Sequence, residues 1–316
     1  MKKVLGKVLL VLLLVLLVIV LGFGIFYASR IQTIRSIQKL SDYEEYNLYR
    51  MDVTYSYDLE NLIRYGVSDN QAMLVYCSPK DGYKSVAFAA LKNLAANQPD
   101  KSTKSAIATL AAPFVCLDGM NEKGVSIAVL TLDSEPTHQE TGKQKIFTTL
   151  AIRLVLDRAA TTQEAVDLLR SYDMFATSGR DYHFYITDAS GDGRVVEYDC
   201  DDPSRPLVDT KIRAITNFYG LYIDRVQPNQ RNGIYGHGKE RYDSIEQVLN
   251  ASTGSITSDT AWLALQAAAR NPNPNDVTSN TQWSLVYNNT NKTAQFVLRR
   301  NWNDVYTYDL NTNSIA

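Results

Sequence analysis

The sequence is poor in the residues that define several classes of protein. It contains three cysteines and three histidines in 316 residues. The cysteines, Cys77, Cys116 and Cys200, form an odd and widely spaced set, which excludes a disulfide framework. The histidines also lie far apart and lack metal-ligand spacing, so we expect no metal site.

The sequence also lacks an excess of charge of either sign. The formal net charge is -2, and no lysine- and arginine-rich run of the kind that binds phosphate backbones is present. We therefore expect no nucleic-acid partner. With 45% hydrophobic and 21% charged residues, the composition is that of an ordinary globular domain with a sizeable core.

One long apolar segment departs from this average. Residues from Val8 to Ser29 carry no charge and follow a basic N-terminus, and about 20 such residues are enough to cross a bilayer. The segment ends in FGIFYASR, where signal-peptide cleavage would require small residues, so we interpret residues 1–30 as an uncleaved membrane anchor. The lysines before it favour a cytoplasmic N-terminus, although Arg30, Arg35 and Lys39 follow it. The main domain is therefore expected outside the cytoplasm.

The pattern of apolar residues after the anchor predicts an α+β fold. Strands precede a pair of helices, and further strands, helices and strands follow, which is typical of antiparallel sheets with helices on their outer faces. The expected elements are a short helical or linker stretch at 31–41, strands at 72–77, 85–91 and 211–219, helices at 148–159, 163–172 (capped by Thr162), 239–250 and 258–270, and hairpins at 183–199 and 281–300.

A short polar turn separates two apolar runs at residues 118–124, which read DGMNEKG. Gly119 and Gly124 permit positive φ angles there. Taken alone, this pattern indicates an ordinary hairpin.

Several segments in order resemble the choloylglycine hydrolase and penicillin acylase family. They are CSPKDGY, DGMNEKG, TTLAIRLVLDRAATTQEAVDLLRSYDM, HFYITDASGDGRVVEY, ITNFY, GKERYD and TQWSLVYN, and the resemblance runs from Gln71 to Leu310. It implies a four-layer α/β/β/α sandwich of antiparallel sheets, as in N-terminal-nucleophile hydrolases, behind one transmembrane helix. It also implies hydrolysis of linear amide C–N bonds without a cofactor.

The chemistry implied by the resemblance is covalent catalysis by an N-terminal cysteine. Its own α-amino group acts as the base, and backbone and asparagine donors stabilise the oxyanion. Asn217 matches an asparagine that holds the oxyanion or the substrate, and Arg241 matches an arginine near the nucleophile. Each also has a structural interpretation, Asn217 at a strand end and Arg241 as a solvated or ion-paired helix residue.

One position departs from the family pattern. Many bile-salt and penicillin V hydrolases have an asparagine after the strand that follows the NEKG turn, whereas this chain reads AVLTLD, with Thr131 nearby. The departure favours linear amides in general over those two substrates.

The expected nucleophile is not found securely. The family's G-R-N-x-D sequence, whose arginine and aspartate orient the cysteine, is absent from the chain. Cys77 is followed by serine, as a nucleophile would be, but its segment resembles one that follows the nucleophile hairpin in relatives. We therefore expect a segment to be missing between Asn70 and Gln71, with 31–70 as a linker and leader-like segment and 71–316 as the hydrolase-like domain.

The function hypotheses follow from this gap. The first is a membrane-anchored extracytoplasmic family member that binds a small-molecule amide but is catalytically impaired. The alternatives are an active amidohydrolase self-processed at Cys77, a non-enzymatic surface binding protein, and a truncated gene product without a settled function. An unrelated anchored adhesion domain would rest on the 20 tyrosines, which are equally typical of strands.

Overall fold

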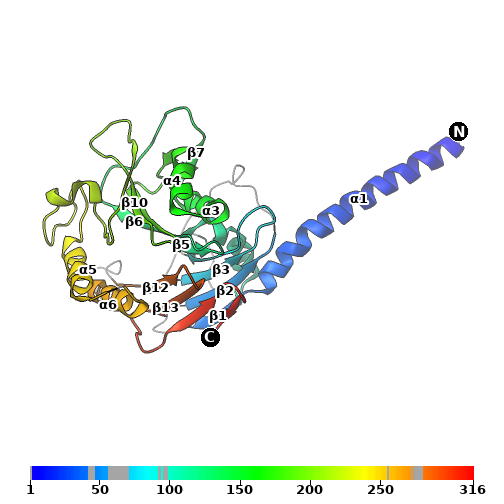
Figure 1. The fold of residues 1–316 in the computed structure, drawn as a ribbon. Coiled ribbons are helices and arrows are strands. Elements are labelled where there is room, and N and C mark those ends of the chain that lie inside the picture. Colours follow the sequence, from blue (N-terminus) through cyan, green and yellow to red (C-terminus); the bar gives the residue numbers. More distant parts are fainter. Residues whose placement is uncertain are drawn as a thin grey trace.

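The computed structural model describes residues 2–41, 47–55, 71–91, 94, 99–254, 256–271, 273 and 280–316. One long helix extends from a body that contains two larger sheets and several helices (Figure 1). The fold is mixed α+β with large antiparallel sheets, which confirms that part of the sequence prediction.

The helices lie close to where the sequence places them. They are α1 (Lys2–Arg35), α2 (Thr103–Ala108), α3 (Thr148–Arg158), α4 (Thr162–Arg170), α5 (Lys239–Ala251) and α6 (Ser258–Ala268), with 3-10 helices η4 (Thr109–Phe114) and η5 (Gly220–Arg225). The cap of α4 differs from the prediction. Thr161 is the N-cap and accepts a hydrogen bond from the backbone N–H of Glu164. Thr162 instead donates its hydroxyl to the backbone carbonyl of Asp192.

Nine strands form the larger sheet, in the order β1-β2-β3-β4-β5-β6-β9-β10-β11. Their bounds are β1 (Gln38–Ser41), β2 (Asn47–Val53), β3 (Gln71–Cys77), β4 (Ser85–Ala90), β5 (Cys116–Asn121), β6 (Ser126–Leu132), β9 (Asp181–Thr187), β10 (Gly193–Tyr198) and β11 (Leu207–Thr210). Neighbouring strands are antiparallel except β2 and β3, which are parallel. This pair departs from the purely antiparallel sheets of the prediction.

The segment before the predicted gap contributes strands to this sheet. α1 continues to Arg35, and residues 38–41 form β1, so the stretch 31–41 is part helix and part strand. β2 pairs with β3 over its whole length, from Asn47 opposite Gln71 to Val53 opposite Cys77. The predicted gap before Gln71 falls at residues 56–70, which lie outside the described residues.

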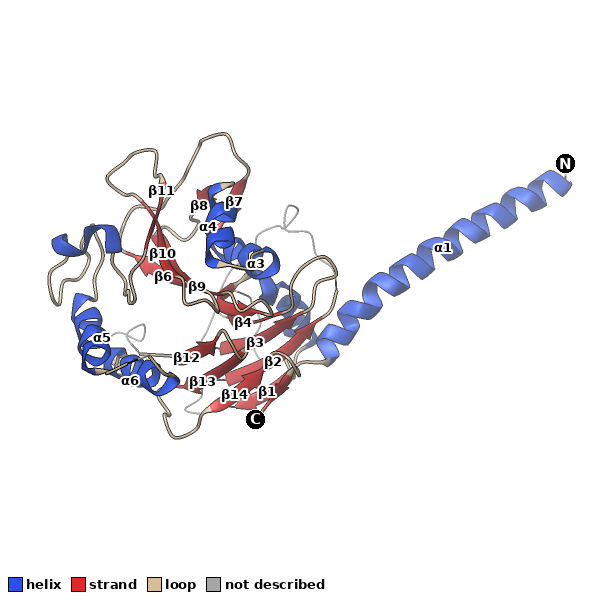
Figure 2. Cartoon of the chain, viewed as in Figure 1, coloured by secondary structure: helices blue, strands red, loops and turns tan. Residues whose placement is uncertain are grey.

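A second sheet lies against the larger one (Figure 2). It contains β12 (Trp283–Asn288), β13 (Thr293–Leu298), β14 (Tyr306–Asp309) and β15 (Ser314–Ile315) in sequential antiparallel order. A small parallel pair, β7 (Lys145–Phe147) and β8 (Asp173–Phe175), flanks α3 and α4. The predicted C-terminal hairpin is thus β12–β13.

Apolar side chains gather on both faces of the larger sheet. One cluster lies between the sheet and α3, and includes Val75, Cys77, Ile127 and Leu156. The other lies between the two sheets, where Phe88 of β4 stacks with Trp283 and meets Phe296 edge-on. The alternation of strand side chains between faces produces both clusters from the same strands.

The predicted strand at 211–219 is not a strand. The segment is irregular and pairs with another loop, through an isolated bridge between Phe218 and Gly236. The carbonyl of Asn217 accepts the backbone N–H of His237, and the hydroxyl of Thr216 donates to the carbonyl of Gly238. Its polar groups therefore bond to the loop before α5 in place of a sheet ladder.

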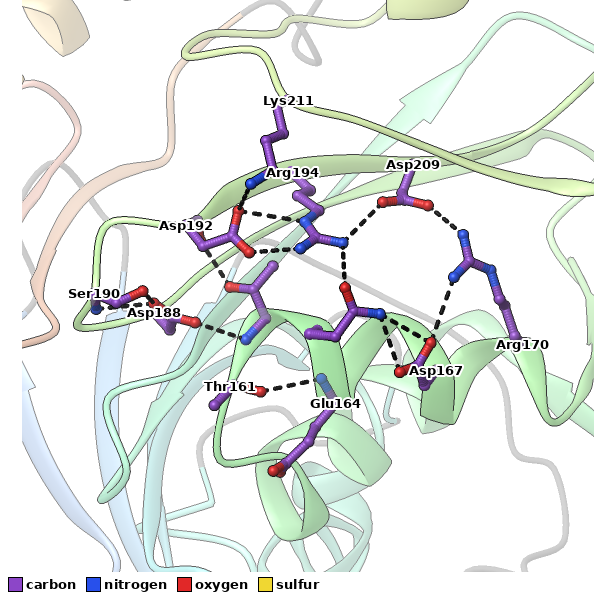
Figure 3. A network of polar contacts seen from close by, with 12 residues as sticks. Thr161, Glu164, Asp167, Arg170, Asp188, Ser190, Asp192, Arg194, Asp209 and Lys211 are labelled. Carbon is purple, nitrogen blue, oxygen red and sulfur yellow. Dashed lines mark hydrogen bonds and ion pairs between the residues drawn. The ribbon is translucent and has the colours of Figure 1, made fainter.

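A network of charged side chains fastens α4 to β10 and β11 (Figure 3). Arg194 lies at its centre, 2.6 Å from Asp192 and 3.0 Å from Asp209, and it also donates to Gln163. Arg170 of α4 pairs with the other side of Asp209. The network holds the outer helix at a fixed place on the sheet.

Candidate functional site

The polar turn between β5 and β6 is fastened to the end of α3 by Asn121. The Asn121 side chain is fully buried, and its Nδ2 donates to the carbonyls of Leu156 and Ala159 at 3.1 and 2.8 Å. Its Oδ1 accepts the backbone N–H groups of Lys123 and Val125, each at 3.0 Å. One side chain thus closes the turn and satisfies carbonyls at the C-terminus of a helix. The asparagine of DGMNEKG has a structural role in this chain.

The two glycines of this turn differ in their roles. Gly124 has φ of +80°, as predicted. Gly119 lies inside β5, and its φ is not in the left-handed region. An added Cβ there would lie 2.5 Å from Cδ1 of Leu156 and 2.9 Å from the carbonyl oxygen of Val86. Gly119 therefore lets α3 approach the sheet closely, which corrects the expectation of a turn conformation.

Asn217 and Arg241 lie together, although 24 residues separate them in the sequence. Nη2 of Arg241 donates to Oδ1 of Asn217 at 2.9 Å, and Nδ2 of Asn217 donates to the carbonyl of Thr131 at 2.9 Å. Thr131, the residue at the departure from the family pattern, thus contacts Asn217 through its backbone carbonyl. Burial lowers the pKa of the Arg241 guanidinium from its ordinary value.

His237 and Asp133 lie beside this pair, and the sequence analysis did not single them out. Nδ1 of His237 is 2.6 Å from Oδ2 of Asp133, and both side chains are partly exposed. The backbone N–H of His237 donates to the carbonyl of Asn217 at 2.7 Å. The sequence feature that could have indicated His237 is its position between two glycines in YGHGK.

Cys77 lies elsewhere on the larger sheet. It is the last residue of β3, fully buried, with Val53 of β2 and Ser85 of β4 opposite it. Its side chain belongs to the cluster beneath α3. The backbone at Cys77 is held between strands on both sides, in the interior of a sheet.

The register of the strands gives the separation of Cys77 from Asn217. Ser85 is opposite Asn121, and the β5–β6 turn follows, so Cys77 lies at the end of the sheet where β6 begins. Thr131 lies at the other end of β6, three strands away. At about 3.3 Å per residue along the strand and 4.8 Å per strand across the sheet, the two sites are roughly 25 Å apart. The sheet does not bring Cys77 to the Asn217–Arg241 pair.

The other two cysteines have surroundings that disfavour a thiolate. Cys116 is fully buried, and burial raises the pKa of its thiol well above the ordinary value. Cys200 follows β10 at the Thr131 end of the sheet, but burial and the neighbouring Asp201 raise the pKa of its thiol to about 11. A thiol with such a pKa is a weak nucleophile at neutral pH.

The remaining question about the site is whether the described part of the chain holds side chains that could bind a metal ion. No cluster of three or more histidine, cysteine, aspartate or glutamate side chains is found there. The side chains near Asn217 are a guanidinium, an amide and a histidine–carboxylate pair.

Comparisons with known proteins agree with this fold. The chain resembles the structure of penicillin V acylase from Agrobacterium tumefaciens, with 19% identity, a TM-score of 0.51, and coverage of 72% of this chain and 70% of that one. It also resembles a variant of conjugated bile acid hydrolase from Clostridium perfringens, with 15% identity, a TM-score of 0.52, and coverage of 74% and 80%. No curated protein sequence matches the chain.

The sequence itself matches one family model. Residues 85–222 match the model of linear amide C–N hydrolases, choloylglycine hydrolase family. This segment contains the β5–β6 turn, the helix pair and Asn217. The match covers less than half of the chain, and together with the shared fold it supports the resemblance to the linear amide C–N hydrolase family.

Proposed function

We propose that this protein is a membrane-anchored, extracytoplasmic family member that binds linear amides beside Asn217 and Arg241, and that it is impaired in cysteine-dependent hydrolysis. The observation that carries the proposal is the separation of roughly 25 Å between Cys77 and this pair, which follows from strand spacing. A nucleophile must reach the carbonyl whose oxygen the donors hold, which requires a few ångströms.

The four-layer arrangement is part of this proposal. Contacts of α3 with β5 and β6, the apolar cluster between the two sheets, and the packing of α6 on β12 support the order α/β/β/α. The domain division is kept as predicted: an anchor at 1–30, a leader-like segment at 31–70, and a hydrolase-like domain at 71–316. In this division, β1 and β2 belong to the leader-like segment, and β2 pairs with β3 in the larger sheet.

Membrane anchoring is supported by α1. Leu13–Arg35 is long and apolar enough to cross a bilayer, and its apolar stretch is exposed to the surroundings. A signal sequence near an N-terminus passes the same test. The ending FGIFYASR and the continuation of the helix to Arg35 favour an anchor that is retained.

Two alternative functions would require different features of the chain. Self-processing at Cys77 would cut the backbone at the end of β3, and residues 71–76 would remain as a separate strand between β2 and β4. A non-enzymatic surface protein would use the Asn217–Arg241 region for binding alone. The names of the similar structures suggest penicillins and conjugated bile acids as first probes of either kind.

The test is the intact mass and N-terminal sequence of the purified full chain, with an amide assay on the same sample. The proposal expects an uncut chain that binds penicillin V or a glycine-conjugated bile acid, with weaker binding in Asn217→Ala and no change in Cys77→Ser. A chain that begins at Cys77 and hydrolyses either amide would overturn the impairment. An uncut chain that binds neither probe would refute the amide site.

A further inference from the structure

Two glycines bring the backbone of His237 against Asn217. Gly236 has φ of +102°, and an added Cβ would lie 2.2 Å from the carbonyl oxygen of Asn217. Gly238 has φ of +86°, and an added Cβ would lie 2.1 Å from Nη2 of Arg241. Side chains at these positions would be strained and would clash. The segment thus places His237 beside the hydrogen-bonded asparagine and arginine of the proposed site.

The histidine is oriented by a carboxylate. Asp133 follows β6 directly and accepts the Nδ1 side of the ring at 2.6 Å, while Arg180 lies 3.8 Å from its other oxygen. Among the described residues, Nε2 of His237 makes no hydrogen bond, and the side chain is 21% exposed. A ring whose Nδ1 proton is held by a carboxylate presents Nε2 as a base.

Groups that stabilise negative charge lie on the other side of His237. Gly238 is the N-cap of α5 and has no side chain to cap the helix, so the positive end of the helix lies next to the guanidinium. Nε of Arg241 is buried and makes no hydrogen bond in the described part of the chain, although Glu240 lies 3.9 Å away. A buried donor of this kind is suited to an acceptor brought by a ligand.

We propose that His237 is the catalytic base of this site, with Asp133 as its positioning residue. The proposal rests on the amide site described above and supplies the base that an N-terminal α-amine provides in the family mechanism. Nε2 takes a proton from a water molecule, and the water oxygen forms a bond to the amide carbonyl carbon. The C–N bond then breaks, and the imidazolium returns the proton to the leaving nitrogen, which yields a carboxylic acid and an amine.

Three histidines make the accessibility of Nε2 measurable in the full chain. Diethyl pyrocarbonate labelling, followed by peptide mass spectrometry, reports each one separately. His183 is fully buried and serves as the unreactive reference, and His138 is exposed and contacts Ala176 and Phe175. We expect His237 to react at least tenfold faster than His183, and penicillin V to slow His237 at least fivefold without slowing His138. A His237 that reacts no faster than His183 would overturn the proposal.

Hydrolysis of penicillin V and a glycine-conjugated bile acid by the full chain is the second measurement. His237→Gln and Asp133→Asn should each lower kcat at least tenfold with little change in KM, and the double variant should be no worse than His237→Gln. His138→Gln is the matched control and should leave kcat unchanged. Hydrolysis that persists at full rate in His237→Gln refutes the base but leaves the amide site standing. If neither probe binds, the amide site is refuted. The labelling rate of His237 relative to His183 then tests only whether its Nε2 is accessible.

Discussion

At the scale of single residues, Asp118 is the group whose surroundings most alter its chemistry. It belongs to the polar turn sequence but lies between the two sheets, where Tyr287 and Trp283 donate to it at 2.6 and 3.3 Å. Burial is the largest effect and raises the pKa of this carboxyl to about 6, although both hydrogen bonds lower it.

This pKa predicts a loss of stability as pH rises. The folded pKa of about 6 exceeds the ordinary value of 3.8, so between these values the folded state holds more protons than the unfolded state. The stability that protonation contributes is complete below about pH 4 and is lost as pH rises to about 6. The cost at pH 7 is on the order of 3 kcal/mol.

Asp118→Asn tests this prediction, because an amide has no charge to desolvate. Urea unfolding at pH 4 and pH 7 should show a smaller loss with rising pH in the variant than in the native chain, by on the order of 3 kcal/mol. Asp304→Asn, at an exposed loop, is the control and should keep the native difference. Parallel pH profiles for Asp118→Asn and the native chain would show that Asp118 keeps an ordinary pKa.

At the scale of elements, the approach of α3 to the sheet depends on the absence of a side chain at Gly119. Gly119→Ala places a Cβ against Leu156 and Val86, and overpacking of this kind costs about 2 kcal/mol. Urea unfolding of the variant measures this loss. Leu156→Ala should recover part of it in the double variant, since Cδ1 of Leu156 is the nearest atom.

The control for this prediction is Gly142→Ala, where nothing lies within 4 Å of the added Cβ. Its φ of +90° leaves only the backbone effect of losing a glycine. If the effects of Gly119→Ala and Leu156→Ala simply added, the close contact between helix and strand would not be the cause of the loss.

The elements also show where sequence patterns suffice. The hairpins at β9–β10 and β12–β13 and the helices α3, α5 and α6 follow the predicted positions because alternation and helical spacing are local properties. Residues 211–219 alternate well enough to suggest a strand, but Thr216 and Asn217 bond to the loop before α5. A local sequence pattern cannot predict hydrogen bonds to a distant loop of this kind.

At the scale of the whole molecule, α1 is both the candidate membrane span and, at its C-terminal end, a part of the folded body. Its last turns are part of the body, since Thr33 is buried and the hydroxyl of Ser36 accepts the backbone N–H of Asp52 at 2.9 Å. The Arg30 guanidinium lies 4.8 Å from the ring centre of Tyr55. The apolar helix therefore continues directly into the body, without a free linker between them.

Deletion of residues 2–28 should release the protein from membranes and leave it folded. The full chain is expected in the membrane fraction after carbonate washing, because α1 is long and apolar enough to span a bilayer. The shortened chain keeps Arg30, Thr33 and Ser36 and should be soluble with a cooperative unfolding transition. Deletion of residues 2–36 is the comparison and should lower stability. A full-length chain found intact in the soluble fraction would contradict the anchor.

The sequence by itself determined the apolar N-terminal helix, most elements of secondary structure and the resemblance to the family, because these depend on composition, local periodicity and ordered motifs. It also indicated Asn217 and Arg241, and the fold places them 2.9 Å apart. Only the tertiary structure decided which residues share their surroundings. Strand register separates Cys77 from the pair, and two close-packed glycines bring His237 and Asp133 to it. Such proximity arises from pairing and packing between distant segments, which no single stretch of sequence records.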